Sequence, residues 1–156
     1  MLRLLFGPFM PGRVGAGLFI FRLVTGLALI MHGLPKAAHP FSWMPHSNLP
    51  GFIQMLSPLA EAGGGLALVL GLLTPLACLG IICNMLVAIF MVHVPSGGSW
   101  IGGKGSYESA LGYLVAGLTL LLTGPGAYSL DAKIFGRRRE LEVPGAVVRE
   151  KAGSRK

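Results

Sequence analysis

Four apolar stretches, each long enough to cross a lipid bilayer, dominate this chain, and three of them carry polar side chains well inside. Arg22, Glu61 and Asn84 occupy these interior positions. An ionisable side chain at the centre of a bilayer costs about 2.5–3.5 kcal/mol, so it normally faces a partner or a water-filled cavity. We therefore expect the helices to close around a polar centre, and we expect the function to reside there.

The composition favours a membrane protein over a soluble one. Of the 156 residues, 53% are hydrophobic and 12% are charged, whereas charged residues make up about 25% of a soluble domain. A transmembrane helix needs about 20 apolar residues, and four such helices account for most of the chain. This length leaves no room for a second catalytic domain.

The apolar stretches predict an all-α membrane protein, a four-transmembrane-helix antiparallel bundle, within residues 1–131. We place its helices at about residues 14–32, 52–73, 76–94 and 107–123. Prolines at regular intervals mark the segment 33–51 as an irregular loop. Thr74-Pro75 forms so short a turn that the second and third helices must be antiparallel neighbours. We expect residues 132–156 to form a loosely ordered basic tail.

The distribution of basic residues predicts the orientation. The terminal segments hold ten Lys and Arg residues, whereas the two loops on the opposite face hold only Lys36 and Lys104. The positive-inside rule then puts both termini in the cytoplasm. The basic tail favours contact with anionic membrane lipid. It lacks the interleaved aromatic residues of a nucleic-acid-binding segment, so we expect no nucleic-acid partner.

Small residues recur at every fourth position on two helices, as Gly63, Ala67 and Gly71 and as Gly80, Asn84 and Ala88. Such stripes let helix backbones approach closely in lipid, where no hydrophobic effect drives association. A general enrichment of glycine in membrane helices is the alternative explanation. Two stripes on adjoining helices favour close packing.

The depths of Arg22 and Glu61 predict that the two side chains pair. With a rise of 1.5 Å per residue, Arg22 lies about 12 Å from one end of its helix and Glu61 about 14 Å from the opposite end of its own. Both positions fall near the middle of a hydrocarbon core about 30 Å thick. We expect Asn84 to hydrogen-bond to this pair and Gln54 to extend the polar stripe outward. The pair is equally open to a structural role and to a functional one.

Further polar side chains fall near the outer rim. His32 and His93 could pass protons or ligate a metal or haem, although ordinary interfacial histidines are commoner. Glu108 begins the fourth helix, where a carboxylate is favoured by the helix dipole. His93 lies nine residues after Asn84, so the two occupy opposite faces of an ideal helix. The sequence contains no Cys/His zinc spacing, and we predict no metal ligand set.

Several short strings together resemble the DoxX family of bacterial membrane proteins. They are Arg22-Leu-Val-Thr-Gly26, Met31-His32-Gly33 with Lys36, Glu61-Ala-Gly63-Gly64, Leu70-Gly71-Leu72-Leu73-Thr74, Tyr107-Glu108, Gly124-Pro125-Gly126 and Ser129-Leu130-Asp131. The resemblance covers about residues 14–131 and implies a multi-pass protein of the bacterial inner membrane. Relatives are implicated in quinone-linked sulfur oxidation and in complexes that handle oxidative and thiol stress. The resemblance therefore implies a role near the electron-transfer chain.

We accordingly expect an integral membrane component of a redox system, with quinone as the leading candidate cofactor and haem as the second. The residues expected to bind the quinone are Arg22, Glu61, Asn84 and Gln54. The residues expected to act in catalysis are Glu61, Arg22, His93, Glu108 and His32. Arg22 and Glu61 would set the electrostatics, and the others would carry protons from the outer side.

Two further functions remain open. The chain could be a non-catalytic scaffold that anchors a soluble partner through its basic tail. It could also be a small transporter or proton pathway, for which four helices leave little room unless the chain forms a homo-oligomer.

Overall fold

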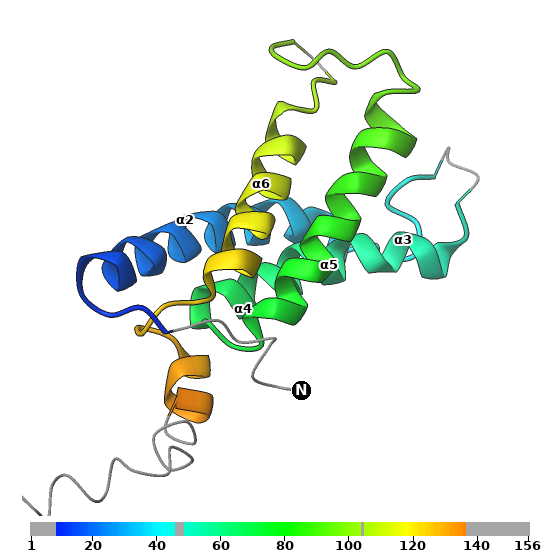
Figure 1. Cartoon of the computed structure of the whole chain (residues 1–156). Helices are drawn as coiled ribbons and strands as arrows, with labels where there is room; N and C mark the ends of the chain where they lie inside the picture. The colour runs from blue at the N-terminus through cyan, green and yellow to red at the C-terminus, as the bar shows by residue number, and fades with distance from the viewer. Residues whose placement is uncertain (1–8, 46–48, 104, 137–156) are drawn as a thin grey trace, which may run out of the picture.

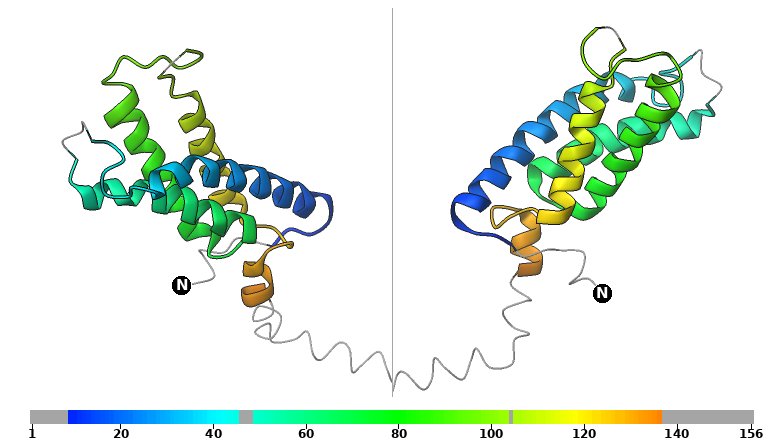
Figure 2. Two further views of the ribbon diagram at one scale, coloured as in Figure 1. Left: turned by 180° about the vertical axis from the view of Figure 1, so that it is seen from behind. Right: turned by 45° about the horizontal axis from the view of Figure 1, so that its top comes forward.

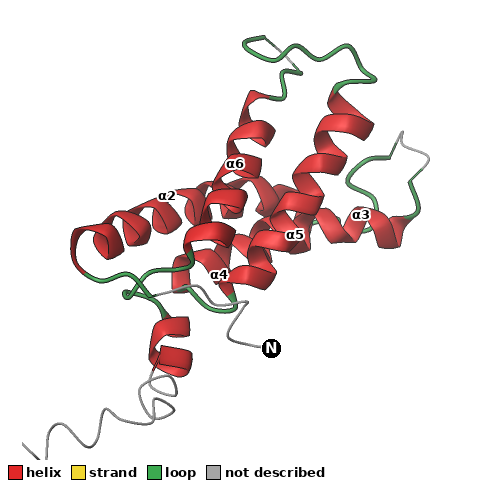
Figure 3. Cartoon of the chain, in the orientation of Figure 1, coloured by secondary structure: helices red, strands yellow, loops and turns green. Residues whose placement is uncertain are grey.

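The computed structural model describes residues 9–45, 49–103 and 105–136, and these residues form helices and loops without a strand (Figures 1 and 3). The first long helix is α2 (Gly12–Ala37). The second is continuous through α3 (Gly51–Pro58), η1 (Leu59–Gly63) and α4 (Gly64–Leu70). The third comprises α5 (Thr74–Val87) and η2 (Ala88–His93), and the chain continues through α6 (Glu108–Thr123) and η3 (Ala132–Gly136). The segments η1, η2 and η3 are π-helical.

The helices associate as two pairs. α2 packs along α4 and η1, whereas α6 packs along α5 (Figures 1 and 2). The side chains buried between the pairs are Leu29, Leu68, Cys78, Ile81, Met85, Ile89, Ala110 and Leu120. Many other large apolar side chains, such as Val24 and Leu122, are exposed. This distribution is expected for helices whose outer faces contact lipid, because there the solvent itself is apolar.

Three helical segments are long and apolar enough to cross a membrane: Gly12–Ala37, Gly51–Leu70 and Thr74–His93. The prediction of an all-helical membrane protein is therefore confirmed for the described residues. The fourth predicted helix is present as α6, but it has 16 residues and a length of only about 24 Å. Residues 137–156, which make up most of the predicted basic tail, lie outside the described residues.

The first two helices end at different places from those predicted. α2 continues to Ala37 across Pro35. Proline lacks a backbone N–H, so it removes one hydrogen bond from the helix. This loss is small because the helix ends within the same turn. The second helix ends earlier, since Gly71 and Leu73 adopt φ values of 63° and 48°. These left-handed residues reverse the chain, and Thr74 then begins α5 with Pro75 in its first turn.

Close approach of α2 and the second helix depends on glycine. A Cβ atom on Gly65 would lie 2.6 Å from the carbonyl oxygen of Gly26, and one on Gly26 would lie 2.6 Å from that of Gly65. A Cβ on Gly33 would lie 2.5 Å from the backbone nitrogen of Ala62. These contacts show that the two helices run antiparallel, with residue 26 against residue 65 and residue 33 against residue 62.

The predicted small-residue stripes are wrong at two of their glycines. Gly63 and Gly80 are both exposed; a Cβ on Gly63 would meet only Leu59, and one on Gly80 would meet nothing within 4 Å. A repeat of four drifts by about 40° per step around a helix of 3.6 residues per turn. The π-helical turn of η1 shifts the face again, so the contact passes through Gly64 and Gly65 instead.

This packing predicts opposite effects for two similar substitutions. Gly65→Ala should lower the free energy of unfolding by about 1–3 kcal/mol, because the added methyl group overlaps the α2 backbone. Gly80→Ala should leave it unchanged or raise it by up to about 1 kcal/mol, since alanine favours the helix. Thermal unfolding in detergent micelles measures both. Equal effects would contradict the close approach of the two helices at Gly65.

Candidate functional site

Arg22 and Glu61 lie in two separate clusters, so the predicted ion pair between them is wrong. The guanidinium of Arg22 donates from Nη1 to the carbonyl of Leu68 at 2.9 Å and from Nη2 to the carbonyl of Tyr128. The carboxylate of Glu61 instead pairs with Lys36. The depth estimate failed because it assumed that the two helices begin and end in the same two planes. The glycine contacts place Glu61 level with residue 33, about 16 Å along α2 from Arg22.

The carboxylate of Glu61 is almost completely buried and is held from three helical segments. Lys36 Nζ lies 2.6 Å from both of its oxygens. Asn84 donates from Nδ2 to Oε1 at 3.0 Å, and the Ser57 hydroxyl lies 3.4 Å from the same oxygen. We call these four residues the Glu61 cluster. The predicted hydrogen bond from Asn84 to the buried pair is thus confirmed for Glu61.

Glu61 lies within a π-helical segment. Pro58 ends α3 immediately before η1, and its ring nitrogen cannot donate the hydrogen bond that a regular helix requires. Wider π turns are rare and occur frequently at functional sites, because they turn a side chain away from its regular helical position. The local sequence thus aims Glu61 toward α2 and α5.

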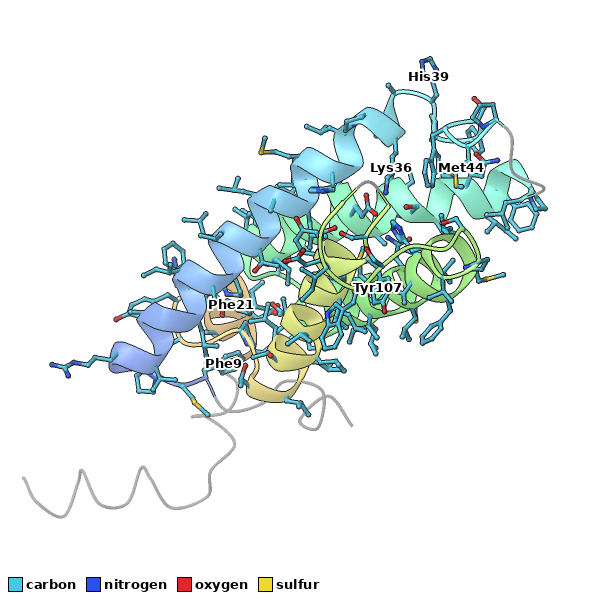
Figure 4. All side chains as sticks on the ribbon, turned by 90° about the horizontal axis from the view of Figure 1, so that it is seen from above. Phe9, Phe21, Lys36, His39, Met44 and Tyr107 are labelled. Carbon is cyan, nitrogen blue, oxygen red and sulfur yellow. The ribbon has the colours of Figure 1, made fainter. Side chains whose placement is uncertain are left out.

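A loop covers the Glu61 cluster and is anchored by Gln54. The ammonium of Lys36 lies 4.7 Å from the centroid of the Trp43 ring, which is a cation–π distance. Trp43 Nε1 donates to the Gln54 carbonyl at 2.8 Å, and the Gln54 side chain bonds to the backbone of Met44 and Leu49. Figure 4 shows Lys36 and Met44 at the same end of the molecule. Gln54 therefore holds this loop in place beside the buried ion pair.

A second cluster joins the opposite end of α2 to the segment after α6. The fully buried carboxylate of Asp131 accepts hydrogen bonds of 2.8 Å from the backbone N–H groups of Leu73 and Thr74, at the start of α5. The Asp131 N–H donates to the Gly71 carbonyl at 2.8 Å. A Cβ on Gly71 would collide with the Arg22 guanidinium. We call Arg22, Gly71 and Asp131 the Asp131 cluster.

The site residues predicted from the sequence did not include Asp131. Its signal was the string Ser129-Leu130-Asp131, which follows the Gly124-Pro125-Gly126 turn after two intervening residues. A polar residue there can cap a neighbouring helix, because the first backbone N–H groups of a helix lack internal partners. The sequence offered no means of identifying α5 as that helix.

The two predicted histidines contact different parts of the molecule. His32 Nδ1 lies 3.0 Å from the carbonyl oxygen of Ala28, and its ring meets the ring of Tyr113 edge-on at 5.5 Å between centroids. His93 Nδ1 lies 3.0 Å from the carbonyl oxygen of Gly105, in the loop before α6. The structure therefore brings His32 to α6, whereas His93 binds the loop and Asn84 faces Glu61.

A shallow, widely open groove of about 610 Å³ lies between α2 and α6. The lining residues are Phe21, Val24, Thr25, Ala28, Glu108, Ser109, Leu111, Gly112, Tyr113, Val115 and Ala116. Most of them are apolar, and the polar ones on α6 gather within its first two turns. Glu108 is exposed there. Of the predicted site residues, Glu108 lines this groove and His32 adjoins it through Tyr113.

Among the residues that the structure describes, no group of three or more His, Cys, Asp or Glu side chains is placed to hold a metal ion. Cys78 and Cys83 are both free thiols.

The Glu61 cluster predicts a specific pattern of stability. Lys36→Met should lower the free energy of unfolding by about 3 kcal/mol, because it leaves a buried carboxylate without its counter-charge. Lys36→Met combined with Glu61→Leu should recover most of this loss. Lys133→Met, at an exposed lysine outside the cluster, should change stability by no more than about 0.5 kcal/mol. A double variant as unstable as the single one would contradict the pairing.

Comparison with known proteins agrees with these features. The sequence model of the DoxX family matches residues 17–94, which is half of the chain. Over 120 residues the chain is 32% identical to the inner membrane protein YqjF of Escherichia coli K12, covering 74% of this chain and 89% of that protein. It is 28% identical over 130 residues to the uncharacterized membrane protein Rv3486 of Mycobacterium tuberculosis H37Rv, covering 74% and 80%. No solved structure matches. The chain belongs to the DoxX family of membrane proteins.

Proposed function

We propose that the chain is the integral membrane component of a redox system and that the groove between α2 and α6 binds a lipid-soluble quinone. The groove is the observation that carries this proposal. Its walls are largely apolar, whereas Glu108, Ser109 and Tyr113 supply polar atoms at the end where α6 begins. A quinone has the same division, with a polar ring and an apolar tail. Sites for such ligands combine apolar walls with a few placed polar groups.

The residues of the chain have separate roles in this proposal. The Glu61 carboxylate accepts hydrogen bonds from Lys36 and Asn84, so it acts as a fixed charge that joins three helices. His32 and Glu108 stand at the polar end of the groove, where exposed titratable groups can exchange protons with water. When bound, the quinone supplies two-electron, two-proton redox chemistry. A soluble redox partner supplies or removes the electrons.

The proposal includes a four-span topology in a bacterial inner membrane, with both termini in the cytoplasm. α6 is about 6 Å shorter than a typical hydrocarbon core, a mismatch that local thinning of the bilayer absorbs. Ten basic residues in the terminal segments support the orientation. The Asp131 cluster then closes the cytoplasmic end of the bundle. A solute path through the bundle would have to pass through this junction. We therefore favour a redox component over a transporter.

Cysteine labelling tests the topology. In a protein whose own Cys78 and Cys83 are replaced by alanine, Ser99→Cys precedes α6 and Lys133→Cys follows it, both at exposed positions. A membrane-impermeant maleimide should label Ser99→Cys in spheroplasts, and it should label Lys133→Cys only after lysis. Labelling of both positions from one side would show that α6 does not span the membrane.

Filling the groove tests the ligand. Gly112 lines the groove, and a Cβ there would meet nothing within 4 Å, so Gly112→Leu should fold normally and obstruct the site. The gently solubilised wild-type protein should retain quinone, which chromatography detects in its organic extract. The quinone content of Gly112→Leu should be at least about tenfold lower. Gly80→Leu is the matched control, because Gly80 is equally unobstructed but lies outside the groove. Equal quinone content in all three proteins, or none in the wild type, would overturn the proposed function.

A further inference from the structure

Thr25 brings a hydroxyl group without an internal partner to the groove between α2 and α6. Its side chain lines the groove and is only 9% exposed. Threonine hydroxyls in helices often donate to the carbonyl four residues earlier, as those of Thr119 and Thr123 on α6 do at 2.8 Å. Within the part of the chain that the structure describes, the Thr25 hydroxyl makes neither this bond nor any other side-chain hydrogen bond.

The hydroxyl oxygen of Thr25 is accessible from the groove. Among the described residues, the fully enclosed side-chain polar atoms without a hydrogen-bond partner are Arg22 Nε and Thr74 Oγ1. Thr25 Oγ1 also has no partner but is not one of these enclosed atoms, so it keeps contact with the surroundings of the protein. Because Thr25 lines the groove, the groove supplies that contact.

The depth of Thr25 restricts what can satisfy its hydroxyl. Thr25 lies thirteen residues after Gly12 and twelve before Ala37 in α2, so it is about 18–20 Å from either end of the helix. This level is the middle of a hydrocarbon core about 30 Å thick, whereas the polar groups of phospholipids lie at its two surfaces. An acyl chain offers no hydrogen-bond acceptor. The occupant that satisfies Thr25 is therefore an apolar molecule that carries its own acceptor.

We propose that the Thr25 hydroxyl positions a bound quinone in this groove by donating a hydrogen bond to one of its carbonyl oxygens. This inference rests on the proposed function. Four residues of α2 line the groove, and three of them, Phe21, Val24 and Ala28, are apolar. The Thr25 hydroxyl is thus the group on this wall that distinguishes a quinone from a lipid acyl chain, because a buried hydroxyl gains free energy only from an occupant that accepts its hydrogen.

A quinone ring at Thr25 lies close to the polar end of the groove. The Tyr113 hydroxyl and the Ala28 carbonyl oxygen lie 3.4 Å and 3.0 Å from the same atom, His32 Nδ1. Tyr113 therefore approaches α2 at the level of Ala28, about one helical turn beyond Thr25. The two carbonyl oxygens of a quinone lie on opposite edges of one ring. With one of them at Thr25, the ring extends toward the groove-lining Tyr113.

Removing the hydroxyl while keeping the shape of the side chain tests this role. The protein in phosphatidylcholine nanodiscs is titrated with decylubiquinone by calorimetry. Thr25→Val should weaken binding by about three- to tenfold, the equivalent of one hydrogen bond. Thr25→Ser keeps the hydroxyl and should bind within about twofold of the wild type. Thr119→Val is the matched control, because the Thr119 hydroxyl already bonds within α6 and Thr119 does not line the groove.

Infrared spectroscopy of the bound ligand gives a measurement that a purely structural role of Thr25 would not change. A hydrogen bond to a carbonyl group lowers its stretching frequency. The carbonyl band of bound decylubiquinone should therefore move to higher frequency in Thr25→Val and keep its position in Thr25→Ser and Thr119→Val. Without ligand, Thr25→Val should unfold at the wild-type temperature or above it, because the lost hydroxyl has no partner among the described residues.

The outcomes separate the two proposals. If the wild-type protein does not bind decylubiquinone, the proposed function and this inference both fall. If it binds and Thr25→Val changes neither the affinity nor the carbonyl band, Thr25 is not the donor, while the quinone site stands. An equal loss of affinity in Thr25→Ser or in Thr119→Val would also refute the hydrogen bond. Weaker binding and a shifted carbonyl band in Thr25→Val alone support the inference.

Discussion

The burial of one carboxylate constrains the arrangement of three helices in this protein. Glu61 lies among helices whose outer faces are apolar, and an uncompensated charge there would be costly. Lys36 and Asn84 compensate it from α2 and α5. This requires α2 to extend beyond the proline of its last turn, and it requires the close backbone approach at Gly33. The offset of α2 against the second helix therefore follows from where Glu61 finds its counter-charge.

The same offset separates the two polar clusters along α2. Arg22 and Lys36 are 14 positions apart in one helix, so about 21 Å separates them along its axis. At the Arg22 end, the Asp131 cluster ties the chain after α6 to the start of α5 and closes the bundle. Near the Lys36 end, the groove presents its polar side chains. A lipid-soluble ligand would therefore enter from the side and meet proton-exchanging groups at one end only.

The sequence was sufficient for the helices and for the presence of buried polar groups, but it could not determine which charge pairs with Glu61. Hydropathy located the helices, since a long apolar stretch by itself indicates a segment that lies in an apolar environment. The depth argument paired Arg22 with the wrong residue, because helix offset depends on backbone contacts such as Gly26 against Gly65 that a one-dimensional pattern does not contain. Asn84 was correctly expected to bond to the buried charge. Tyr113 gave no polar signal within its apolar helix, and its relation to His32 arises only from the packing of α6.

Photo-crosslinking with an azido-substituted quinone, followed by peptide mass spectrometry, tests the central claim most directly. The account predicts that the label attaches within residues 21–28 of α2 and 108–116 of α6, and that excess decylubiquinone suppresses this labelling. Labelling confined to other helices, or labelling of these segments that excess decylubiquinone does not suppress, would contradict the assignment of the groove as the quinone site.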